Sequence, residues 1–207
     1  MDLAADDERP DLTADDDRPD LATGGPRTAL VAAVAVGVVV ALLLVVLATR
    51  DPSSERVTRS PLLGRLAPAV EGPTLDGGTF DLQGQRGRWV VVNFFATWCI
   101  PCLEEHPELA AFDAAHADAG DATVVSVLFD DDPDKARATF EERGGDWPVV
   151  VDDEGAVSVA YGVARVPESF LVAPDGTVVQ RLVGGVTAAQ LDGLLDQYEA
   201  AAREPST

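Results

Sequence analysis

The feature that most constrains this chain is a continuous apolar run that leads into a pair of cysteines. Trp89–Phe95 (WVVVNFF) predicts a buried strand, since an uninterrupted apolar run of this length is typical of a strand covered on both faces. Cys99 and Cys102 follow shortly after it, and the segment from Cys102 to about Ala117 predicts a helix, with apolar residues at helical spacing. A Cys-x-x-Cys pair alone is a weak signal, but at a strand-to-helix junction it predicts a thiol redox site.

The position of the pair explains how one sulfur becomes reactive. Free backbone N–H groups and the helix dipole create positive potential at a helix N-terminus, which stabilises a thiolate there. We assign the nucleophile to Cys99 and expect Cys102, at the first turn of the helix, to attack the resulting mixed disulfide. Pro101 lies in the first turn, where its missing N–H costs little. Trp98 is expected to shield one side of the sulfurs.

The chain has two cysteines and two histidines, which limits the other uses of the pair. A disulfide scaffold needs more cysteines, and a structural zinc site normally draws on four Cys or His ligands. His106 follows Cys102 by four residues, but with His116 as the only other histidine we expect no metal site. The run Asp130–Asp134 lacks the alternating ligands and central glycine of a calcium loop, so it predicts a helix-capping turn. We expect no cofactor besides the Cys99–Cys102 dithiol/disulfide itself.

The charge balance is strongly acidic, with 15 Lys and Arg against 36 Asp and Glu and a formal net charge of −21. Nucleic acid is excluded as a partner, because phosphate binding needs clustered basic residues. Adhesion to an anionic lipid surface is disfavoured for the same reason. The charge is best interpreted as a contribution to solubility rather than to the fold.

The N-terminal part is expected to carry a tail and a membrane anchor. Residues 1–28 contain two copies of an acidic nine-residue unit, DLAADDERP and DLTADDDRP, and predict a disordered tail. Ala29–Ala48 has no charge, proline or polar side chain, and its length of about 30 Å as a helix matches the hydrocarbon core. The leader is acidic and Leu47-Ala48-Thr49 is a poor cleavage site, which favours an uncleaved signal anchor over a cleaved signal peptide.

Residues 49–65 predict a linker, punctuated by Asp51-Pro52-Ser53-Ser54 and Ser60-Pro61, and residues 66–203 a globular domain. The arginines on the two sides of the anchor do not decide its orientation. We place the domain outside the cell membrane and the tail in the cytoplasm, since the cytosol already holds abundant soluble thiol reductants.

The domain alternates strands with helices and ends in a hairpin, which predicts a mixed α/β sheet. The predicted strands and helices, besides those at the cysteines, are a short hairpin over 72–82, strands at 123–129 and 149–151, helices at 134–143 and 156–161, a hairpin of 169–173 and 178–183 around Pro174-Asp175-Gly176, and a last helix from Thr187 to about Ala202.

Val90–Leu109 (VVVNFFATWCIPCLEEHPEL) resembles the active-site region of thioredoxin-like proteins. More narrowly, it resembles the TlpA, ResA and CcmG/DsbE group of membrane-tethered bacterial thioredoxins, with similarity over about Leu66–Leu195. The resemblance implies a thioredoxin fold, with the sheet between helices. It also implies a specific reducing role, often in cytochrome c maturation.

Three further features carry the resemblance. Arg165–Leu171 (RVPESFL) is similar to the family's cis-proline loop, with Pro167 at the cis position. Gly72–Leu82 is similar to the group's added N-terminal β-hairpin. Glu105, three residues after Cys102, matches a glutamate that the family uses near its disulfide.

Two acidic residues are candidates for proton transfer. Asn93 occupies the place of a buried aspartate in classical thioredoxins, and an amide cannot accept that proton. Glu105 lies one turn beyond Cys102, and Glu168 adjoins the cis-proline position, so either could act as the base. Both would oppose a thiolate by like-charge repulsion, which lowers the reduction potential and favours a reductase. The alternative is that both are ordinary surface acids.

The sequence therefore predicts an enzyme that reduces disulfides in extracytoplasmic proteins, apocytochrome c being one candidate, and that receives electrons from a membrane thiol reductant. An oxidase or isomerase on the same fold is the first alternative. A non-catalytic thioredoxin-fold chaperone or haem-handling adaptor is the second.

Overall fold

The structure is a computed structural model that describes residues 26–48 and 60–203, which fall into two units, Met1–Ser54 and Glu55–Thr207. In the first unit it describes one helix, α1 (Pro26–Ala48). Within the described residues, no helix is both long enough and apolar enough to cross a bilayer. The predicted acidic tail up to residue 25 and the predicted linker over 49–59 lie outside the described residues.

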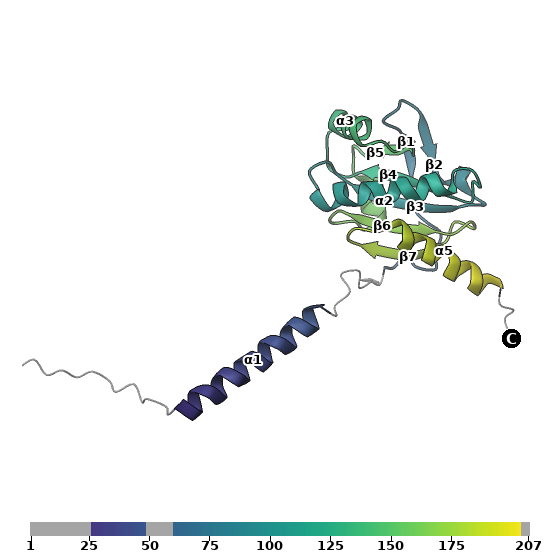
Figure 1. The fold of residues 1–207 in the computed structure, drawn as a ribbon. Helices are drawn as coiled ribbons and strands as arrows, with labels where there is room; N and C mark the ends of the chain where they lie inside the picture. Colours follow the sequence, from purple (N-terminus) through teal and green to yellow (C-terminus); the bar gives the residue numbers. More distant parts are fainter. Residues whose placement is uncertain (1–25, 49–59, 204–207) are drawn as a thin grey trace, which may run out of the picture. The chain divides into compact units, whose positions relative to one another are not determined.

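The second unit is built on a five-stranded sheet in the order β5–β4–β3–β6–β7 (Figure 1). β3 runs parallel to β4, and β4 parallel to β5, whereas β6 is antiparallel to both β3 and β7. The sheet is therefore mixed, as predicted. The strands are β3 (Trp89–Phe95), β4 (Ala122–Leu128), β5 (Val149–Val151), β6 (Glu168–Val172) and β7 (Val178–Val183).

Helices cover both faces of this sheet, and every residue of β3 is buried. On one face, α2 (Ile100–His116) and α5 (Ala188–Arg203) contribute Phe112 and Leu191 to a core that includes Val91 and Val124 of the sheet. On the other face, α4 (Ala156–Tyr161) packs Tyr161 on the sheet. The apolar run that marks β3 in the sequence thus lies at the centre of the domain.

The smaller elements complete the fold near the sheet edges. β1 (Glu71–Pro73) and β2 (Thr79–Asp81) form the predicted antiparallel hairpin, followed by an unpredicted 3-10 turn, η1 (Leu82–Gln85). α3 (Pro133–Arg143) begins after Asp132, whose carboxylate accepts hydrogen bonds from the first-turn N–H groups. The Asp-rich run is therefore the predicted helix cap.

Most boundaries lie within one residue of the predicted ones, and two differ for a structural reason. α2 begins at Ile100, two residues earlier than expected, because Cys99 acts as the residue that caps it. Part of the predicted linker contacts the domain: the Gly64 N–H donates to the carbonyl of Val178, and the Val178 N–H donates to that of Arg65. Backbone pairing with β7 is a long-range feature that local composition does not indicate.

Candidate redox site

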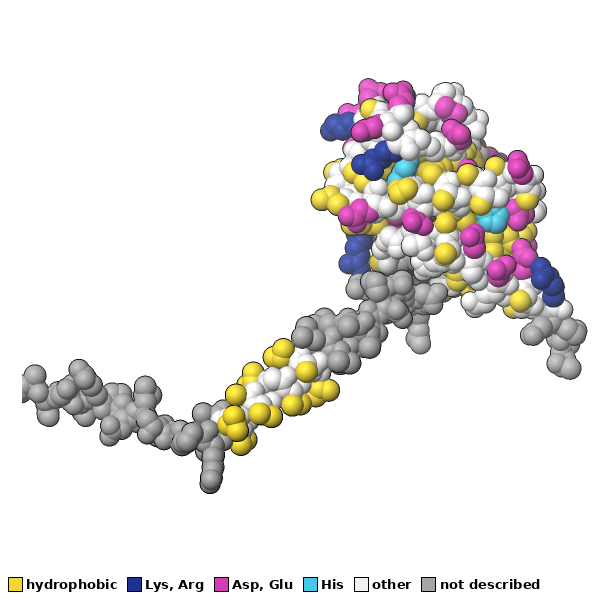
Figure 2. Space-filling model, in the orientation of Figure 1, with side chains coloured by type: hydrophobic (Ala, Val, Ile, Leu, Met, Phe, Trp, Pro, Cys, Tyr) yellow, Lys and Arg dark blue, Asp and Glu magenta, His cyan; other side chains and the backbone are white. Residues whose placement is uncertain are grey.

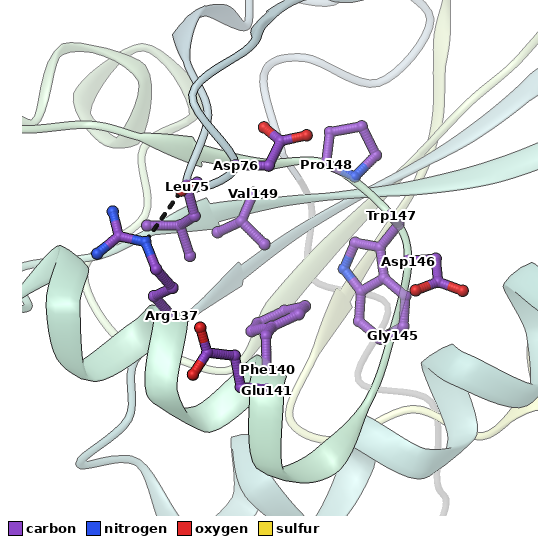
Figure 3. A pocket seen from close by; sticks show the side chains of 10 residues that line it. All are labelled: Leu75, Asp76, Arg137, Phe140, Glu141, Gly145, Asp146, Trp147, Pro148 and Val149. Atoms are coloured by element: carbon purple, nitrogen blue, oxygen red, sulfur yellow. Dashed lines mark hydrogen bonds between the residues drawn. The ribbon is translucent and has the colours of Figure 1, made fainter.

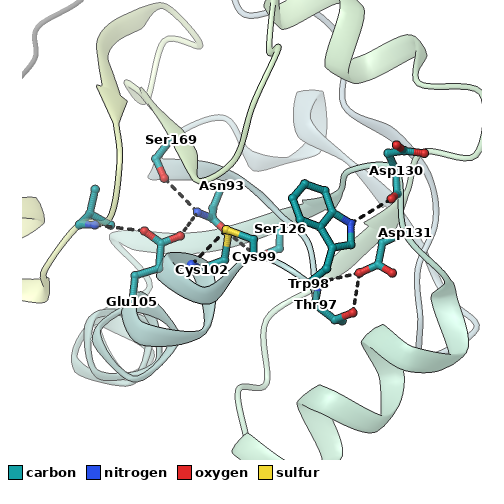
Figure 4. The surroundings of a disulfide bond; sticks show 11 residues. Asn93, Thr97, Trp98, Cys99, Cys102, Glu105, Ser126, Asp130, Asp131 and Ser169 are labelled. Atoms are coloured by element: carbon teal, nitrogen blue, oxygen red, sulfur yellow. Dashed lines mark hydrogen bonds between the residues drawn. A yellow bond between two sulfur atoms is a disulfide. The ribbon is translucent and has the colours of Figure 1, made fainter. Parts of the chain in front are cut away.

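The site forms where β3 ends and α2 begins. Cys99 and Cys102 are joined by a disulfide, with their Cα atoms 5.3 Å apart (Figure 4). Cys99 has extended backbone angles and caps α2, and the Cys102 N–H donates to the Cys99 sulfur at 3.2 Å. Pro101 occupies the first turn, as expected. When the disulfide is reduced, an N–H donor at this distance favours the thiolate form of Cys99.

The residues beside the cysteines differ sharply in exposure. Cys99 and Cys102 are 5% and 4% exposed, whereas Trp98 and Ile100 are 57% and 69% exposed. The Trp98 indole N–H donates to the carbonyl of Asp130 at 3.2 Å, so its ring is turned toward the loop between β4 and α3 (Figure 4). The site therefore presents two large apolar side chains around a largely buried disulfide. Shielding of the sulfurs by Trp98 stays a prediction.

A second contact ties the same two loops together. The backbone N–H and the hydroxyl of Thr97 both donate to one carboxylate oxygen of Asp131, at 2.5 and 2.6 Å. Burial acts to raise the pKa of Asp131, but the hydrogen bonds from Thr97 outweigh it and the pKa is lowered. The loop that carries the cysteines is thus fixed by an ionised aspartate.

The loop before β6 also reaches this region. The Val166–Pro167 peptide bond is cis, as the family resemblance implied. Val166 packs against the small cluster of buried residues that includes Cys99 and Cys102. Pro167 is buried, and Glu168 after it pairs with Phe94 at the end of β3. Strand pairing between β3 and β6 therefore places the cis-proline loop beside the disulfide.

Glu105 is a buried carboxyl group with two hydrogen-bond donors. Its residue is 3% exposed, and its two oxygens accept from the Asn93 side-chain amide at 2.8 Å and from the Val186 N–H at 3.0 Å. Burial raises the pKa of Glu105 to about 7, although both hydrogen bonds act in the opposite direction. A carboxyl with this pKa can both accept and release a proton near neutral pH.

Glu168 is equally buried but has a different environment. It is 1% exposed and forms an ion pair with Arg181 of β7. Side chains alternate along β6, so Glu168 shares a face with Phe170, opposite the face of its neighbour Ser169. The alternative that Glu105 and Glu168 are surface acids is wrong, because both are buried. The cation beside Glu168 offsets the repulsion that was expected from this residue.

Three polar side chains cross the apolar sheet side by side on the face that Glu105 covers. Ser126 of β4 and Ser169 of β6 are the strand partners of Asn93 in β3. The Asn93 amide N–H₂ donates to the Ser169 hydroxyl at 3.1 Å, and the Asn93 amide oxygen accepts from the Ser126 hydroxyl at 3.3 Å. The Ser126 oxygen in turn accepts from the Trp147 indole N–H at 2.8 Å. The sequence patterns do not predict Ser126, Ser169 or Trp147 as site residues. The available signal for the two serines was a small polar residue inside an apolar strand, and Trp147 had no such signal.

His106 and His116 each have contacts with residues other than the two cysteines. His106 lies against Phe140 and Trp147, with ring centroids 4.8 and 5.1 Å away, and its Nε2 is 2.7 Å from the Gly144 carbonyl. His116 contacts two aspartates at the other end of α2. Over residues 26–48 and 60–203, no group of three His, Cys, Asp or Glu side chains is arranged to hold a metal ion.

A mixed sheet between helices, with a Cys-x-x-Cys disulfide at the start of the helix after the central strand and a cis-proline beside it, defines a thioredoxin-fold protein. The pair can exist as a disulfide or as two thiols. Residues 62–195 match the Redoxin family, to which the chain belongs.

Similar proteins carry names that describe disulfide exchange. The chain is 34% identical over 122 residues to the thiol:disulfide interchange protein CycY of Rhizobium leguminosarum, covering 58% of this chain and 63% of CycY. It is 33% identical over 134 residues to the thiol-disulfide oxidoreductase ResA of Bacillus thuringiensis, covering 64% and 76%. The crystal structure of a thioredoxin-family thiol:disulfide interchange protein from Chlorobium tepidum superposes with a TM-score of 0.59 at 26% identity, covering 68% of this chain and 97% of that one.

Proposed function

We propose that this protein is an extracytoplasmic thiol–disulfide oxidoreductase that reduces disulfides in partner proteins. One observation carries the proposal. The Cys99 sulfur lies at the N-terminus of α2 and accepts a hydrogen bond from the backbone N–H of Cys102, its disulfide partner. The same geometry can lower the proton affinity of one sulfur and keep the second sulfur within reach of it.

The reaction begins with the reduced pair. The Cys99 thiolate attacks one sulfur of the substrate disulfide, which forms a mixed disulfide and releases the other substrate sulfur as a thiolate that takes up a proton. Cys102 loses its proton to Glu105 and attacks the Cys99 sulfur, which releases the second substrate thiolate. This thiolate takes up a proton, and Glu105 returns the proton of Cys102 to the solvent. The substrate gains two electrons and two protons, and the protein ends as the Cys99–Cys102 disulfide. A membrane thiol reductant restores the pair.

Glu105 favours the reducing direction over oxidation or isomerisation. An ionised carboxylate that is buried one turn beyond Cys102 in α2 opposes a thiolate, which makes the dithiol state less stable and lowers the reduction potential. Equilibration of the full chain in micelles with glutathione buffers tests this. We expect a potential nearer to about −270 mV than to about −120 mV, the value of a strong periplasmic oxidant. A value at the oxidising end would exclude the reductase.

The membrane anchor is part of the proposal. This part rests on the sequence, in which Ala29–Ala48 has no charged, proline or polar residue, and not on the described helices, none of which is long and apolar enough to cross a bilayer. A single-pass anchor here, with residues 1–28 in the cytoplasm, would place the redox domain outside the membrane. Protease added to intact spheroplasts should then remove the domain and leave the tail protected. Protection of the domain, or its release from membranes by alkaline carbonate, would contradict this topology.

The substrate class is extracytoplasmic proteins that contain a disulfide, and apocytochrome c is the first candidate to test. A Cys102→Ala variant should hold its substrate as a mixed disulfide through Cys99, to be identified by mass spectrometry after non-reducing electrophoresis. The matched control is the double variant Cys99→Ala/Cys102→Ala, which should trap nothing. If the double variant still supports function in a deletion strain, the non-catalytic adaptor is favoured instead.

A further inference from the structure

Trp147 lies between a surface cavity and the row of buried polar side chains formed by Ser126, Asn93 and Ser169, here called the buried polar row. One side of its ring lines a cavity of about 440 Å³ formed by the β1–β2 hairpin, α3 and the segment before β5 (Figure 3). Its indole N–H donates to Ser126 at 2.8 Å. A Cβ at Gly145 would lie 2.6 Å from the indole ring, so the glycine backbone is close to the ring. The Phe140 ring packs against the indole with the two ring centroids 5.3 Å apart. The position of this indole is therefore closely fixed.

The donor at the end of the row determines the direction of every hydrogen bond in it. An indole nitrogen can only donate, so Ser126 must accept from Trp147 and can direct its own hydrogen at the Asn93 carbonyl oxygen. That contact turns the N–H₂ group of Asn93 toward Glu105, where it donates at 2.8 Å. Ser169 cannot set this orientation, because a hydroxyl can either donate or accept.

We propose that Trp147 and Ser126 are positioning residues, which orient the Asn93 amide so that it donates to Glu105 and keeps this carboxylate a hydrogen-bond acceptor, ready to take the proton of Cys102. The inference rests on the proposed function for its role in the reaction. Without the fixed donor, the Asn93 amide can turn over and present its oxygen to Glu105. A carboxyl facing that oxygen is stable only in its protonated form, and a protonated carboxyl cannot act as a base.

The other groups around Glu105 do not supply this control. In α2, the ring nitrogen of His106 is directed at a backbone carbonyl, and Glu108 accepts from a backbone N–H of α5. Glu168 and Arg181 neutralise each other on the opposite face of the sheet. The disulfide carries no charge. Among the described residues Glu105 forms no ion pair, so its remaining donor is the Val186 N–H, which is the same in every variant.

The test measures the proton affinity of Glu105 directly in the oxidised full chain in micelles. Carbon-13 at the glutamate side-chain carboxyls reports their titration by NMR, and the Glu105 signal is identified by its loss in Glu105→Gln. Ser126→Ala and Trp147→Phe should each move the Glu105 midpoint upward by about one pH unit. Ser126→Thr keeps the hydroxyl and should restore the original midpoint. Tyr161→Phe, which removes a partly buried hydrogen bond on the other face of the sheet, should not move it.

The outcomes separate this inference from the proposed function. An unchanged Glu105 midpoint in both Ser126→Ala and Trp147→Phe, with their folds intact by circular dichroism, would overturn the role of Trp147 and leave the exchange activity standing. A wild-type chain that traps and reduces no disulfide substrate would overturn the proposed function, whatever the Glu105 titration shows. A midpoint that moves equally in Tyr161→Phe would mean a general loss of packing and would also overturn the inference.

Discussion

Glu105 and Glu168 are two buried carboxyl groups in different environments. Glu168 has a cation, Arg181, as its partner. Glu105 has two neutral donors, and burial raises its pKa to about 7. Because a buried charge without a cation is costly, Glu105 should weaken the fold whenever it is ionised. This cost is consistent with a group retained for proton transfer rather than for stability.

A pH-dependent stability follows for Glu105. The unfolded chain releases this proton near pH 4.5, whereas the folded protein holds it until about pH 7. Between these values the folded state binds more protons, so the free energy of unfolding falls as the pH rises, and the loss is complete above pH 7. The difference corresponds to on the order of 3 kcal/mol. Glu105→Gln should lack this loss when urea unfolding is compared at pH 4.5 and 8.

The control for this experiment is the next residue in the chain. Glu104 is exposed, so Glu104→Gln should follow the wild-type dependence on pH. Other titrating groups affect all three proteins alike, so the difference between the variants isolates Glu105. An identical fall in stability in Glu105→Gln and wild type would show that Glu105 does not titrate in this range.

The sequence predicts individual site residues only where the signal is local. Cys99 and Cys102 are recognisable because a strand, a tight connection and a helix start follow one another within one segment. Ser126 meets Asn93 through strand register, 33 positions further along the chain, and Trp147 meets Ser126 through a loop, 21 positions further still. Nothing near either residue in the sequence indicates these partners. The buried row of polar side chains therefore needed the sheet pairing to be known.

At the scale of elements, α2 lacks one backbone hydrogen bond, and a side chain of α3 replaces it. Pro107 lies inside α2 and has no N–H, so the carbonyl of Leu103 loses its usual helical donor. The Arg143 guanidinium, at the last residue of α3, donates to that carbonyl at 3.2 Å. One hydrogen bond thus replaces the missing helical one and joins the redox helix to α3.

This replacement predicts coupling between the two positions. Arg143→Ala should lower the free energy of unfolding by about 0.5–1 kcal/mol in the wild type, since the contact is exposed. In a Pro107→Ala background the restored backbone N–H satisfies the carbonyl, so the same change should cost almost nothing. Urea unfolding of the four proteins measures the coupling. As a control, the effects of Arg203→Ala, at the end of α5, and Pro107→Ala on the free energy of unfolding should add. If the effects of Arg143→Ala and Pro107→Ala add equally well, Arg143 does not replace the missing hydrogen bond.

Whole elements were predictable where periodicity or turn chemistry is strong. β3 follows from its continuous apolar run, and the β6–β7 hairpin from Pro174-Asp175-Gly176. η1 was missed because four residues are too few to show a helical period. The start of α2 was placed late because Cys99 itself supplies the cap that Ser, Thr, Asp or Asn usually provides. Local rules thus fail where the site chemistry replaces an ordinary structural residue.

At the scale of the whole molecule, the acidic charge should select among substrates. Asp and Glu side chains are spread across the visible face of the domain (Figure 2). Asp130, Asp131 and Asp132 lie in the loop that the exposed Trp98 contacts. A negative potential of this kind attracts cationic partners over a distance of about 10 Å at 0.1 M salt. Exchange with basic segments should therefore be faster than exchange with acidic ones.

Two peptides with the same disulfide, one flanked by lysines and the other by glutamates, test this selection. The reduced full chain should react about tenfold faster with the lysine peptide at low salt, because long-range attraction raises the encounter rate. The ratio should approach one at about 0.5 M salt, where these charges are screened. Stopped-flow fluorescence measures both rates. Equal rates at low salt would show that the net charge has no part in substrate choice.

The hydrogen bond from the Cys102 backbone to the Cys99 sulfur also bears on how long a substrate stays attached. Once a partner is linked to Cys99, the thiol that displaces it is already held one turn away on the same rigid helix. Intramolecular attack at such range is far faster than attack by any dissolved thiol. We therefore expect the covalent complex to be short-lived, with Cys102 itself releasing the partner protein.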